Sequence, residues 1–398
     1  MFRVLGVAGA AAYLLVLPFA HATSLRSASL LLAAAAAVAL FGRPGRGARL
    51  VLLAFAAWLV ASAVSLLSST DLEASLRAIE NEVLRSCVVF MVFYTLVQVR
   101  PSWTPWVAAT AFGFAALSAL AVREFYLHER WTGYLVPPLG DFTTSALTAL
   151  PMLVGYLGVP GRRAGVVWLV RVAIVAILVA AYFSFSRAFW LVLMAGALTG
   201  AMLYLRQGGR FDARFALPLV MLCSGCIALA SAAALEKGHR TLGDSTARVA
   251  IYAAVASKIV DNPATGTGYG HETDKSWYAA ALPHWSVFHA HNMVLSYVDQ
   301  MGPLGLAALL ALFGLPAYLF ARNLHHPSAE ARMAALCGLT LLLCVLAKNT
   351  FDYFFIKQNL WLFFAHLGFY VALIDRASDS RADSASATEM SRTSRLAG

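Results

Sequence analysis

The chain has 398 residues, of which 60% are hydrophobic and only 13% are charged, and its formal net charge is +10. A soluble globular chain is nearer half apolar and a quarter charged, so this composition excludes an ordinary soluble domain and indicates a polytopic membrane protein. The positive charge is spread over short loops without a basic block that contains aromatic residues, so nucleic acid is not an expected partner.

The N-terminal segment allows two interpretations. Arg3, the apolar run after it and Ala20-His21-Ala22 are similar to a secretory signal peptide with its cleavage site. The alternative is an uncleaved first membrane span. We favour the span and leave the cleavage of residues 1–22 open, because the topology of everything downstream is the same in both cases.

The rest of the chain is a series of apolar segments. A helix needs about 20 apolar residues to cross the hydrocarbon core, and on this basis we predict about twelve spans. They lie near residues 4–20, 28–42, 50–68, 86–100, 104–122, 142–160, 165–185, 188–205, 215–234, 292–321, 333–350 and 354–374. The expected fold is all-α, with a single transmembrane helical domain over residues 1–374. Residues 235–290 form a long outside loop with short helices, and the Ser-, Ala- and Arg-rich residues 375–398 are predicted to be a disordered cytoplasmic tail.

The arginines divide the loops between the two sides of the membrane. Short basic loops are typical of the cytoplasmic side, and alternate loops and the tail carry Arg43, Arg46, Arg49, Arg100, Arg162, Arg163, Arg206, Arg210, Arg214, Arg322, Arg332 and Arg376. The opposite loops are more balanced in sign and are expected outside: residues 69–85, 123–141, 186–187, 235–290 and 349–353. The polar clusters of interest then lie outside, where ATP is not the energy source and an activated substrate must be delivered across the membrane.

The first candidate site residue is Arg187, in the sequence YFSFSRAFW. An arginine between two spans is costly unless it faces a cavity or an anionic partner. It is either an interfacial side chain that reaches lipid phosphate or an anion-binding group that lines a cavity beside Ser186.

Arg248 belongs to a predicted outside helix near residues 244–261, in which Arg248 and Tyr252 share one face. A solvated arginine on a surface helix is the competing interpretation, and a second short helix is expected near residues 275–282. We interpret the three glycines between these helices as a tight structural turn, because they do not form a dinucleotide-binding pattern. They are Gly266, Gly268 and Gly270.

The sequence FHAHNMVLSYVDQMGPLG places His289 and His291 at the mouth of a long apolar span. On a helix they would point about 200° away from each other, and no Cys or carboxylate stands nearby, so a metal site is not expected. Asn292 is a candidate helix cap. Gly302-Pro303 should kink the helix, which puts His291 about 16 Å above the kink. At this position it is either a general base or an interfacial histidine.

Two further pairs are open to interpretation. Lys348 and Asp352 are spaced to pair with each other on one helix face, and Asp352 is also a candidate to orient His291 or to contact substrate. Cys223 and Cys226 form a C-x-x-C pair, but they lie in an apolar span, which argues against a redox or metal role.

The order of these features resembles the O-antigen ligase and polymerase superfamily of membrane glycosyltransferases. Its ligase and protein-glycosylating branches share a signature in which His and then Asn, Ser or Gln precede nine residues and Gly-x-x-Gly, Thr or Tyr. Here His291-Asn292, residues 293–301 and Gly302-Pro303-Leu304-Gly305 match every defined position.

Two shorter stretches extend the resemblance to about residues 180–310. Ser186-Arg187 followed by Trp190 looks like one family motif. Arg248 and Tyr252, followed by Pro263 and the glycine turn, look like another.

The resemblance implies a transferase that takes a glycan from a polyprenyl diphosphate, needs no metal or other cofactor and inverts the anomeric carbon. It implies that His291 is the catalytic base. Arg187 and Arg248 would bind the donor diphosphate, because a guanidinium group holds two phosphate oxygens and stays charged. The candidate supporting residues are His289, Asn292, Ser186, Tyr252 and Asp352.

The expected function is therefore that of an O-antigen ligase in lipopolysaccharide biosynthesis. It would move a polymerised glycan from undecaprenyl diphosphate to the lipid A–core saccharide, at the periplasmic face of a bacterial inner membrane and in contact with membrane lipids. The alternatives are a polysaccharide polymerase with a glycan acceptor, a protein-glycosylating oligosaccharyltransferase, and a transporter of lipid-linked glycans without covalent chemistry.

Overall fold

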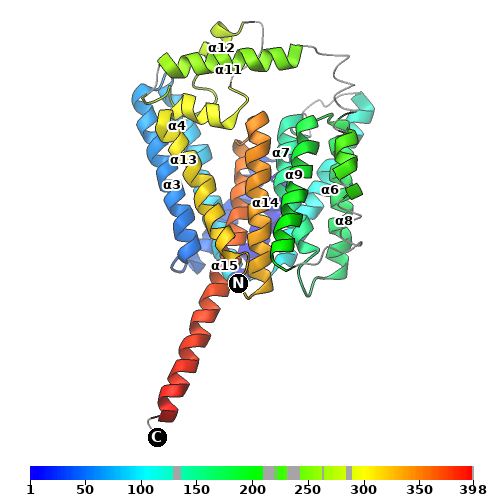
Figure 1. The fold of residues 1–398 in the computed structure, drawn as a ribbon, viewed down its shortest axis with the longest axis vertical. Helices are drawn as coiled ribbons and strands as arrows, with labels where there is room; N and C mark the ends of the chain where they lie inside the picture. Colours follow the sequence, from blue (N-terminus) through cyan, green and yellow to red (C-terminus); the bar gives the residue numbers. More distant parts are fainter. Residues whose placement is uncertain are drawn as a thin grey trace.

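The structure is a computed structural model that describes residues 1–128, 136–208, 220–221, 223–229, 231, 243–261, 264–283 and 289–396. Long helices run side by side as a bundle (Figure 1), and no strand occurs within these ranges. The bundle helices are α1 (Phe2–Val16), α2 (Thr23–Leu40), α3 (Arg46–Ser65), α5 (Arg85–Val99), α6 (Trp103–His128), α7 (Leu139–Tyr156), α8 (Ala164–Phe183), α9 (Arg187–Arg206), α13 (Met293–Asn323), α14 (Ala329–Phe351) and α15 (Lys357–Leu396).

The all-α membrane fold predicted from the composition is confirmed. Nine helices in the described part of the chain are long and apolar enough to cross a membrane. α1 is apolar but shorter, at 15 residues, and packs against α2 and α6. α7 lies within the bundle but is not among the nine, and part of the predicted span near residues 215–234 lies outside the described ranges. The predicted count of about twelve spans is therefore not established by these helices.

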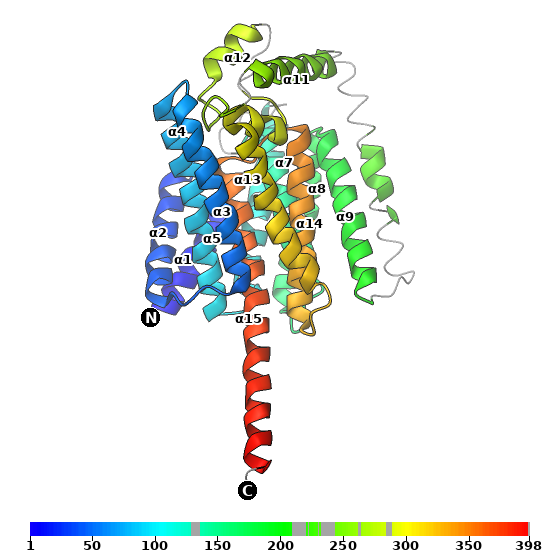
Figure 2. The same cartoon turned by 60° about the vertical axis from the view of Figure 1, so that its left-hand side comes forward.

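The two ends of the bundle differ in what they carry. Both chain termini lie at one end, which we call the lower end after its place in Figure 1. The opposite, upper end carries α4 (Leu72–Ala78) and two helices that lie across it, α11 (Gly243–Asp261) and α12 (Lys275–Ala281) (Figures 1 and 2). The 3₁₀ helix η1 (Leu66–Ser68) precedes α4, and the π-helix η2 (Ile79–Leu84) follows it. The two outside helices predicted near residues 244–261 and 275–282 correspond to α11 and α12.

α15 forms the centre of the bundle and then leaves it. Its membrane segment is 89% buried, and it packs against α5, α14 and α7. The helix continues to Leu396 and projects away from the lower end (Figure 2), through residues for which the sequence predicts disorder. Residues 375–396 contain neither glycine nor proline, and adding residues to an existing helix avoids the cost of starting a new one.

The kink in α13 and the glycine turn fit together as one unit. Gly302 has φ 62° and ψ −153°, so the helix is interrupted there as its Gly-Pro pair predicts. Pro303 has no N–H to donate to the carbonyl of Asp299, and Thr267 N–H donates to that carbonyl instead, over 3.1 Å. Gly268 N–H likewise donates to the carbonyl of Gln300 over 3.1 Å. The turn therefore replaces the backbone hydrogen bonds that the kink removes.

Candidate active site at the upper end of the bundle

His291 and Asp352 form a hydrogen-bonded pair at the upper end. His291 lies just before α13, and Asp352 is the C-cap of α14, so two neighbouring helix ends bring the side chains together. Nδ1 of His291 lies 3.0 Å from Oδ1 of Asp352, and the two side chains are 28% and 22% exposed. This partial exposure lets a substrate reach the histidine, while the carboxylate holds the ring in place.

The charge state of Asp352 fixes the role of each imidazole nitrogen. Burial favours the neutral acid, but the hydrogen bond from His291 and the positive charges of Lys348, His291 and Arg248 outweigh it and hold the pKa of Asp352 below its usual value. An ionised carboxylate only accepts hydrogen bonds, so Nδ1 of His291 must donate. In the neutral ring, Nε2 then carries the free lone pair and is the atom that can accept a proton.

Backbone geometry at His291 and Asn292 sets the direction of the imidazole. His291 has φ 51°, in the left-handed region that few non-glycine residues adopt. Asn292 caps α13 as predicted, because its Oδ1 accepts the N–H of Leu295 over 3.1 Å. Its Nδ2 donates to the carbonyl of Thr350 over 3.0 Å. Asn292 therefore joins the start of α13 to the end of α14, the two segments that supply the His–Asp pair.

His289 supports His291 through the backbone, and the two histidines are closer than predicted. We expected them to point apart as they would on a helix, and this expectation is wrong, because they precede α13 in a non-helical segment. Their ring centroids are 4.1 Å apart. The N–H of His291 donates to Nδ1 of His289 over 3.0 Å. Burial lowers the pKa of His289 well below its usual value, so its ring is neutral.

Lys348 is a buried cation of the site to which the sequence assigned only a pairing role. It is 1% exposed, and its Nζ lies 3.5 Å from Oδ2 of Asp352, so the predicted i, i+4 pair is present. Asp352 therefore contacts a cation with one oxygen and His291 with the other. The four-residue spacing that predicts the ion pair was therefore also the sequence evidence that Lys348 belongs to the site.

Arg248 lies on the helix that covers the site. α11 packs against α13 through Ile251 and Val255, which are buried with Tyr278 and Leu282 of the α12 region. Arg248 and Tyr252 are half-buried on α11, as the predicted face implies. The charge of Arg248 is close enough to Asp352 to stabilise its carboxylate. The structure therefore brings Arg248 together with Lys348, Asp352 and His291.

Arg187 lies at the same height but does not touch this group. It is the first, exposed residue of α9, and Ser186 caps that helix by accepting the N–H of Phe189 over 3.4 Å. Gly196 of α9 faces Cys344 of the antiparallel α14, where an added Cβ would lie 2.6 Å from the sulfur. Counted from this contact, Arg187 and Asp352 both lie about 12–14 Å higher, at 1.5 Å per residue. No ion pair of Arg187 occurs within the described part of the chain.

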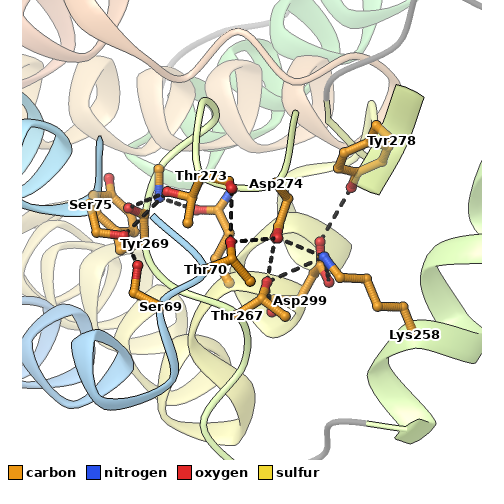
Figure 3. A network of polar contacts seen from close by, with 12 residues as sticks. Ser69, Thr70, Ser75, Lys258, Thr267, Tyr269, Thr273, Asp274, Tyr278 and Asp299 are labelled. Carbon is orange, nitrogen blue, oxygen red and sulfur yellow. Dashed lines mark hydrogen bonds and ion pairs between the residues drawn. The ribbon is translucent and has the colours of Figure 1, made fainter. Parts of the chain in front are cut away.

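A second polar cluster at the upper end was not predicted (Figure 3). The ammonium of Lys258 on α11 lies 2.7 Å from Oδ2 of Asp274 and 2.9 Å from Oδ1 of Asp299. Thr267 donates a hydrogen bond to Asp274, and Tyr278 donates to Oδ2 of Asp299 over 3.2 Å. All five residues are buried. They come from four separate segments, so no local spacing in the sequence signals the cluster.

Metal ligands are not grouped in the described part of the chain. No set of three or more His, Cys, Asp or Glu side chains is placed there to hold a metal ion. His289 and His291 are close, but one ring nitrogen of each is already engaged, with the His291 N–H and with Asp352 respectively. The groups that do lie together are the His291 imidazole, the Asp352 carboxylate and the Lys348 ammonium.

Comparisons with known proteins point to the same part of the chain. Residues 172–310 match the family model described as O-Antigen ligase. The comparison with curated proteins found no match. The matched region runs from α8 into α13, so it contains Arg187, Arg248 and His291 but ends before Lys348 and Asp352.

Proposed function

We propose that this chain, which belongs to the O-antigen ligase family through residues 172–310, transfers a glycan from undecaprenyl diphosphate to the lipid A–core saccharide. The family supports a membrane glycosyltransferase of the ligase and polymerase type. The observation that carries the finer proposal is the His291–Asp352 pair, which is partly exposed at the end of the bundle and contacts the cation Lys348. A transferase needs such a base, whereas a transporter without covalent chemistry does not.

The proposed reaction is a single displacement at the anomeric carbon. Nε2 of His291 accepts the proton of an acceptor hydroxyl as its oxygen attacks the anomeric carbon. The bond from that carbon to the diphosphate oxygen breaks, and the diphosphate leaves with the electron pair. Attack from the side opposite the leaving group inverts the configuration. Asp352 stabilises the imidazolium that forms, because its carboxylate accepts the hydrogen bond from Nδ1.

The departing diphosphate requires positive charge on its own side of the site. Lys348 contacts Asp352, the charge of Arg248 also acts on Asp352, and Arg187 lies at the same height on the helix next to α14. Arginine binds phosphate oxygens through two parallel hydrogen bonds and stays charged throughout the reaction. We therefore assign Arg187 and Arg248 to the donor diphosphate, and Lys348 to the balance of charge around Asp352.

An apolar crevice below these cations suits the lipid part of the donor. It has a volume of about 450 Å³ and lies between α7, α9 and α14. Its walls include Leu150, Val154, Gly196, Ala197, Leu336 and Cys344. Small residues on α9 let a chain approach the helix backbone closely. A polyprenyl chain in this crevice would place its diphosphate at the level of Arg187.

The two ends of the bundle suggest how it is oriented. The connections at the lower end carry Arg43, Arg100, Arg162, Arg163 and Arg322, together with both termini. Short basic loops favour the cytoplasmic side. We therefore place the lower end in the cytoplasm and the His291 end in the periplasm, with the chain in the inner membrane.

Complementation separates this function from its alternatives. His291→Ala and His325→Ala are expressed in a strain that lacks the gene, and surface glycolipid and lipid-linked polymer are analysed by gel and mass spectrometry. His325 is the matched control, because it is exposed in the lower connection between α13 and α14. We expect His291→Ala to leave bare core and to accumulate polymer on the carrier lipid, while His325→Ala restores ligation.

Two other results would replace the proposal. If a single repeat unit still attaches to the core but chains do not lengthen, the protein is a polymerase. If His291→Ala restores both polymerisation and ligation, His291 is not the base, and a transport function without covalent chemistry gains support.

A further inference from the structure

A polar cavity lies beside the Lys258 cluster, at the upper end of the bundle. Its volume is about 400 Å³, and it is bounded by the end of η1, the segment after it, the glycine turn, α11 and α12. The side chains that the cavity offers to a ligand are those of Ser68, Thr70, Lys258, Thr265, Asp274 and Trp277. No role was assigned to this cavity above, and it lies in a different part of the upper end from Arg187 and the α7–α9–α14 crevice.

The charges of the cluster restrict which ligands can enter. The ammonium of Lys258 is shared by the carboxylates of Asp274 and Asp299 within 2.9 Å, so the ion group carries one excess negative charge. An anionic ligand such as a phosphate would meet this excess charge, and a metal cation would meet the ammonium that already occupies the space between the two carboxylates. A neutral ligand that forms hydrogen bonds meets neither obstacle.

The walls of the cavity match a saccharide in particular. The hydroxyls of Ser68 and Thr70 donate to protein carbonyls and can still accept a hydrogen bond, that of Thr265 can donate and accept, and Asp274 accepts. Trp277 supplies an apolar side and is half-buried, with Lys258 Nζ 4.6 Å from its ring centroid. A sugar ring presents hydroxyls at its edge and apolar C–H groups on its faces, so it complements such a set of groups.

The position of the cavity relative to His291 indicates which glycan it would bind. Asp299 is six residues after Met293, where α13 begins just beyond His291, so the cluster begins about 9 Å along α13 at 1.5 Å per residue. The cavity is lined by Ser68 and Thr70 of the α3–α4 connection, and Arg187 begins α9. α3 and α4 lie on one side of α14 and α9 lies on the other (Figures 1 and 2). An inverting displacement brings the acceptor from the side opposite the departing diphosphate. The cavity is on that side.

We propose that this cavity binds a saccharide unit of the acceptor glycan, at a short distance from the hydroxyl that reacts. The proposal rests on the transfer function given above, because it takes Arg187 as the donor side. It adds a specificity site: the acceptor would be selected by its inner sugars at Thr70, Asp274 and Trp277, as well as by the hydroxyl at His291.

Direct binding tests the cavity without requiring catalysis. The probe is core oligosaccharide released by mild acid from the lipopolysaccharide of a strain without the gene. Its binding to the purified full-length protein in lipid nanodiscs is measured by saturation-transfer NMR and titration. Ala264 lines the cavity and is exposed, so Ala264→Trp fills the space without removing a side-chain contact. Ala279→Trp is the matched control, since Ala279 is exposed on α12 and does not line the cavity.

We expect Ala264→Trp to weaken binding at least tenfold and Ala279→Trp to leave it unchanged. Trp277→Ala, which removes the apolar wall, should also weaken it. Circular dichroism and elution volume confirm that each variant is folded. Absence of binding to the wild type, or equal binding to wild type and to both cavity variants, would overturn the proposal.

Two further experiments test this proposal independently of the transfer function and distinguish an acceptor site from a donor site. His291→Ala should bind the core oligosaccharide normally while it loses transfer. If His291→Ala transfers normally but cavity variants still lose binding, the transfer mechanism fails and the saccharide site stands. If polymer glycan released from the donor binds in an Ala264-dependent way and core oligosaccharide does not, the cavity is a donor subsite and the acceptor assignment is wrong.

Discussion

His291 is held by four features at once: a left-handed backbone, the Asp352 carboxylate, the His289 ring under its N–H, and the Asn292 cap that follows it. Left-handed backbone at a non-glycine residue costs of the order of 1–3 kcal/mol and persists where the surroundings enforce it. Here two residues of the same segment and one from another helix end enforce it. As a result, Nε2 of His291 points in a defined direction.

Asp352→Asn tests the tautomer argument at the residue scale. The amide can donate to Nδ1 of His291 and so allow the proton to sit on Nε2, where it blocks the lone pair that catalysis requires. We expect transfer to fall by about 100-fold or more, with the affinity for the donor little changed. Initial rates with a defined lipid-linked donor measure both. Asp261→Asn, an exposed carboxylate at the end of α11, should retain wild-type rates.

The buried ring of His271 should make the stability of the protein depend on pH. Burial, together with the nearby charge of Lys357, lowers the pKa of His271 from 6.5 to about 3. The unfolded chain binds a proton near pH 6.5 and the folded chain does not, so this residue makes stability fall as pH drops from about 6.5 towards 3. His271→Phe should reduce this acid sensitivity and keep stability at pH 7, since neither ring nitrogen has a hydrogen-bond partner among the described residues. Thermal unfolding at several pH values measures it, and an unchanged pH slope would contradict it.

The roles of single residues could be predicted where the interval between two residues in the sequence determines how they interact. The interval from His291 to Gly302 gave the cap, the kink and the position of the base, and the four-residue step from Lys348 to Asp352 gave the ion pair. The contact between His289 and His291 was missed because both residues were assumed to be helical, whereas they precede the start of α13. Lys258 was missed because its partners are distant in sequence.

Among the elements, α13 depends on its interruption. An alanine at Gly302 would need φ 62°, and its Cβ would lie 2.6 Å from the carbonyl oxygen of Ala264 in the neighbouring turn. We expect Gly302→Ala to cost about 2 kcal/mol or more and to lower the thermal midpoint. Gly314→Ala is the control on the same helix, because an added Cβ there meets nothing within 4 Å. Equal midpoints for the two variants would show that the kink is not required.

The ion group at Lys258 joins α11, α12 and α13, so it also holds the helix that carries Arg248. Lys258→Met leaves two buried carboxylates without their cation, and breaking a buried pair in this way costs about 3–5 kcal/mol. Lys275→Met removes an exposed pair with Glu272, whose side chains are 66% and 64% exposed, and should change stability little. Thermal unfolding compares the two, and similar midpoints would mean that the cluster does not anchor the upper helices.

The existence of a helix was predicted well where the length of an apolar segment determines it. Contacts between segments that are distant in sequence were predicted poorly. Apart from the span near residues 215–234, which lies partly outside the described ranges, the segments expected to span are helices, with small shifts at most of their ends. α11 was predicted from the residues that share one of its faces. The pairing of the glycine turn with the carbonyls at Asp299 and Gln300 could not be foreseen, because it depends on which segment lies beside the kink. The helical tail after Ile374 differs from the predicted disorder for a local reason, its lack of glycine and proline.

For the whole molecule, the difference between the two ends of the bundle predicts how the protein is oriented in the membrane. We expect the lower end to face the cytoplasm, because its short connections carry the arginines. Alkaline phosphatase inserted between α11 and α12 should therefore be active, and green fluorescent protein fused after residue 398 should fluoresce. Activity of phosphatase fused at the lower end, in the connection between α13 and α14, would invert the assignment.

The whole bundle places His291, the candidate base, at one end, between a candidate donor side and a candidate acceptor side. α15 fills the centre, and Asp352 and His291 lie at the adjoining ends of α14 and α13. α9, which lines the crevice, lies on the other side of α14 from α3 and α4, whose connection lines the cavity (Figure 1). The most direct test of this account is transfer by the purified protein in nanodiscs from a defined undecaprenyl-diphosphate glycan to lipid A–core, with wild type and His291→Ala compared under identical conditions. The account predicts transfer by the wild type and a loss of about 100-fold or more in the variant, with donor binding retained. Equal rates would contradict it.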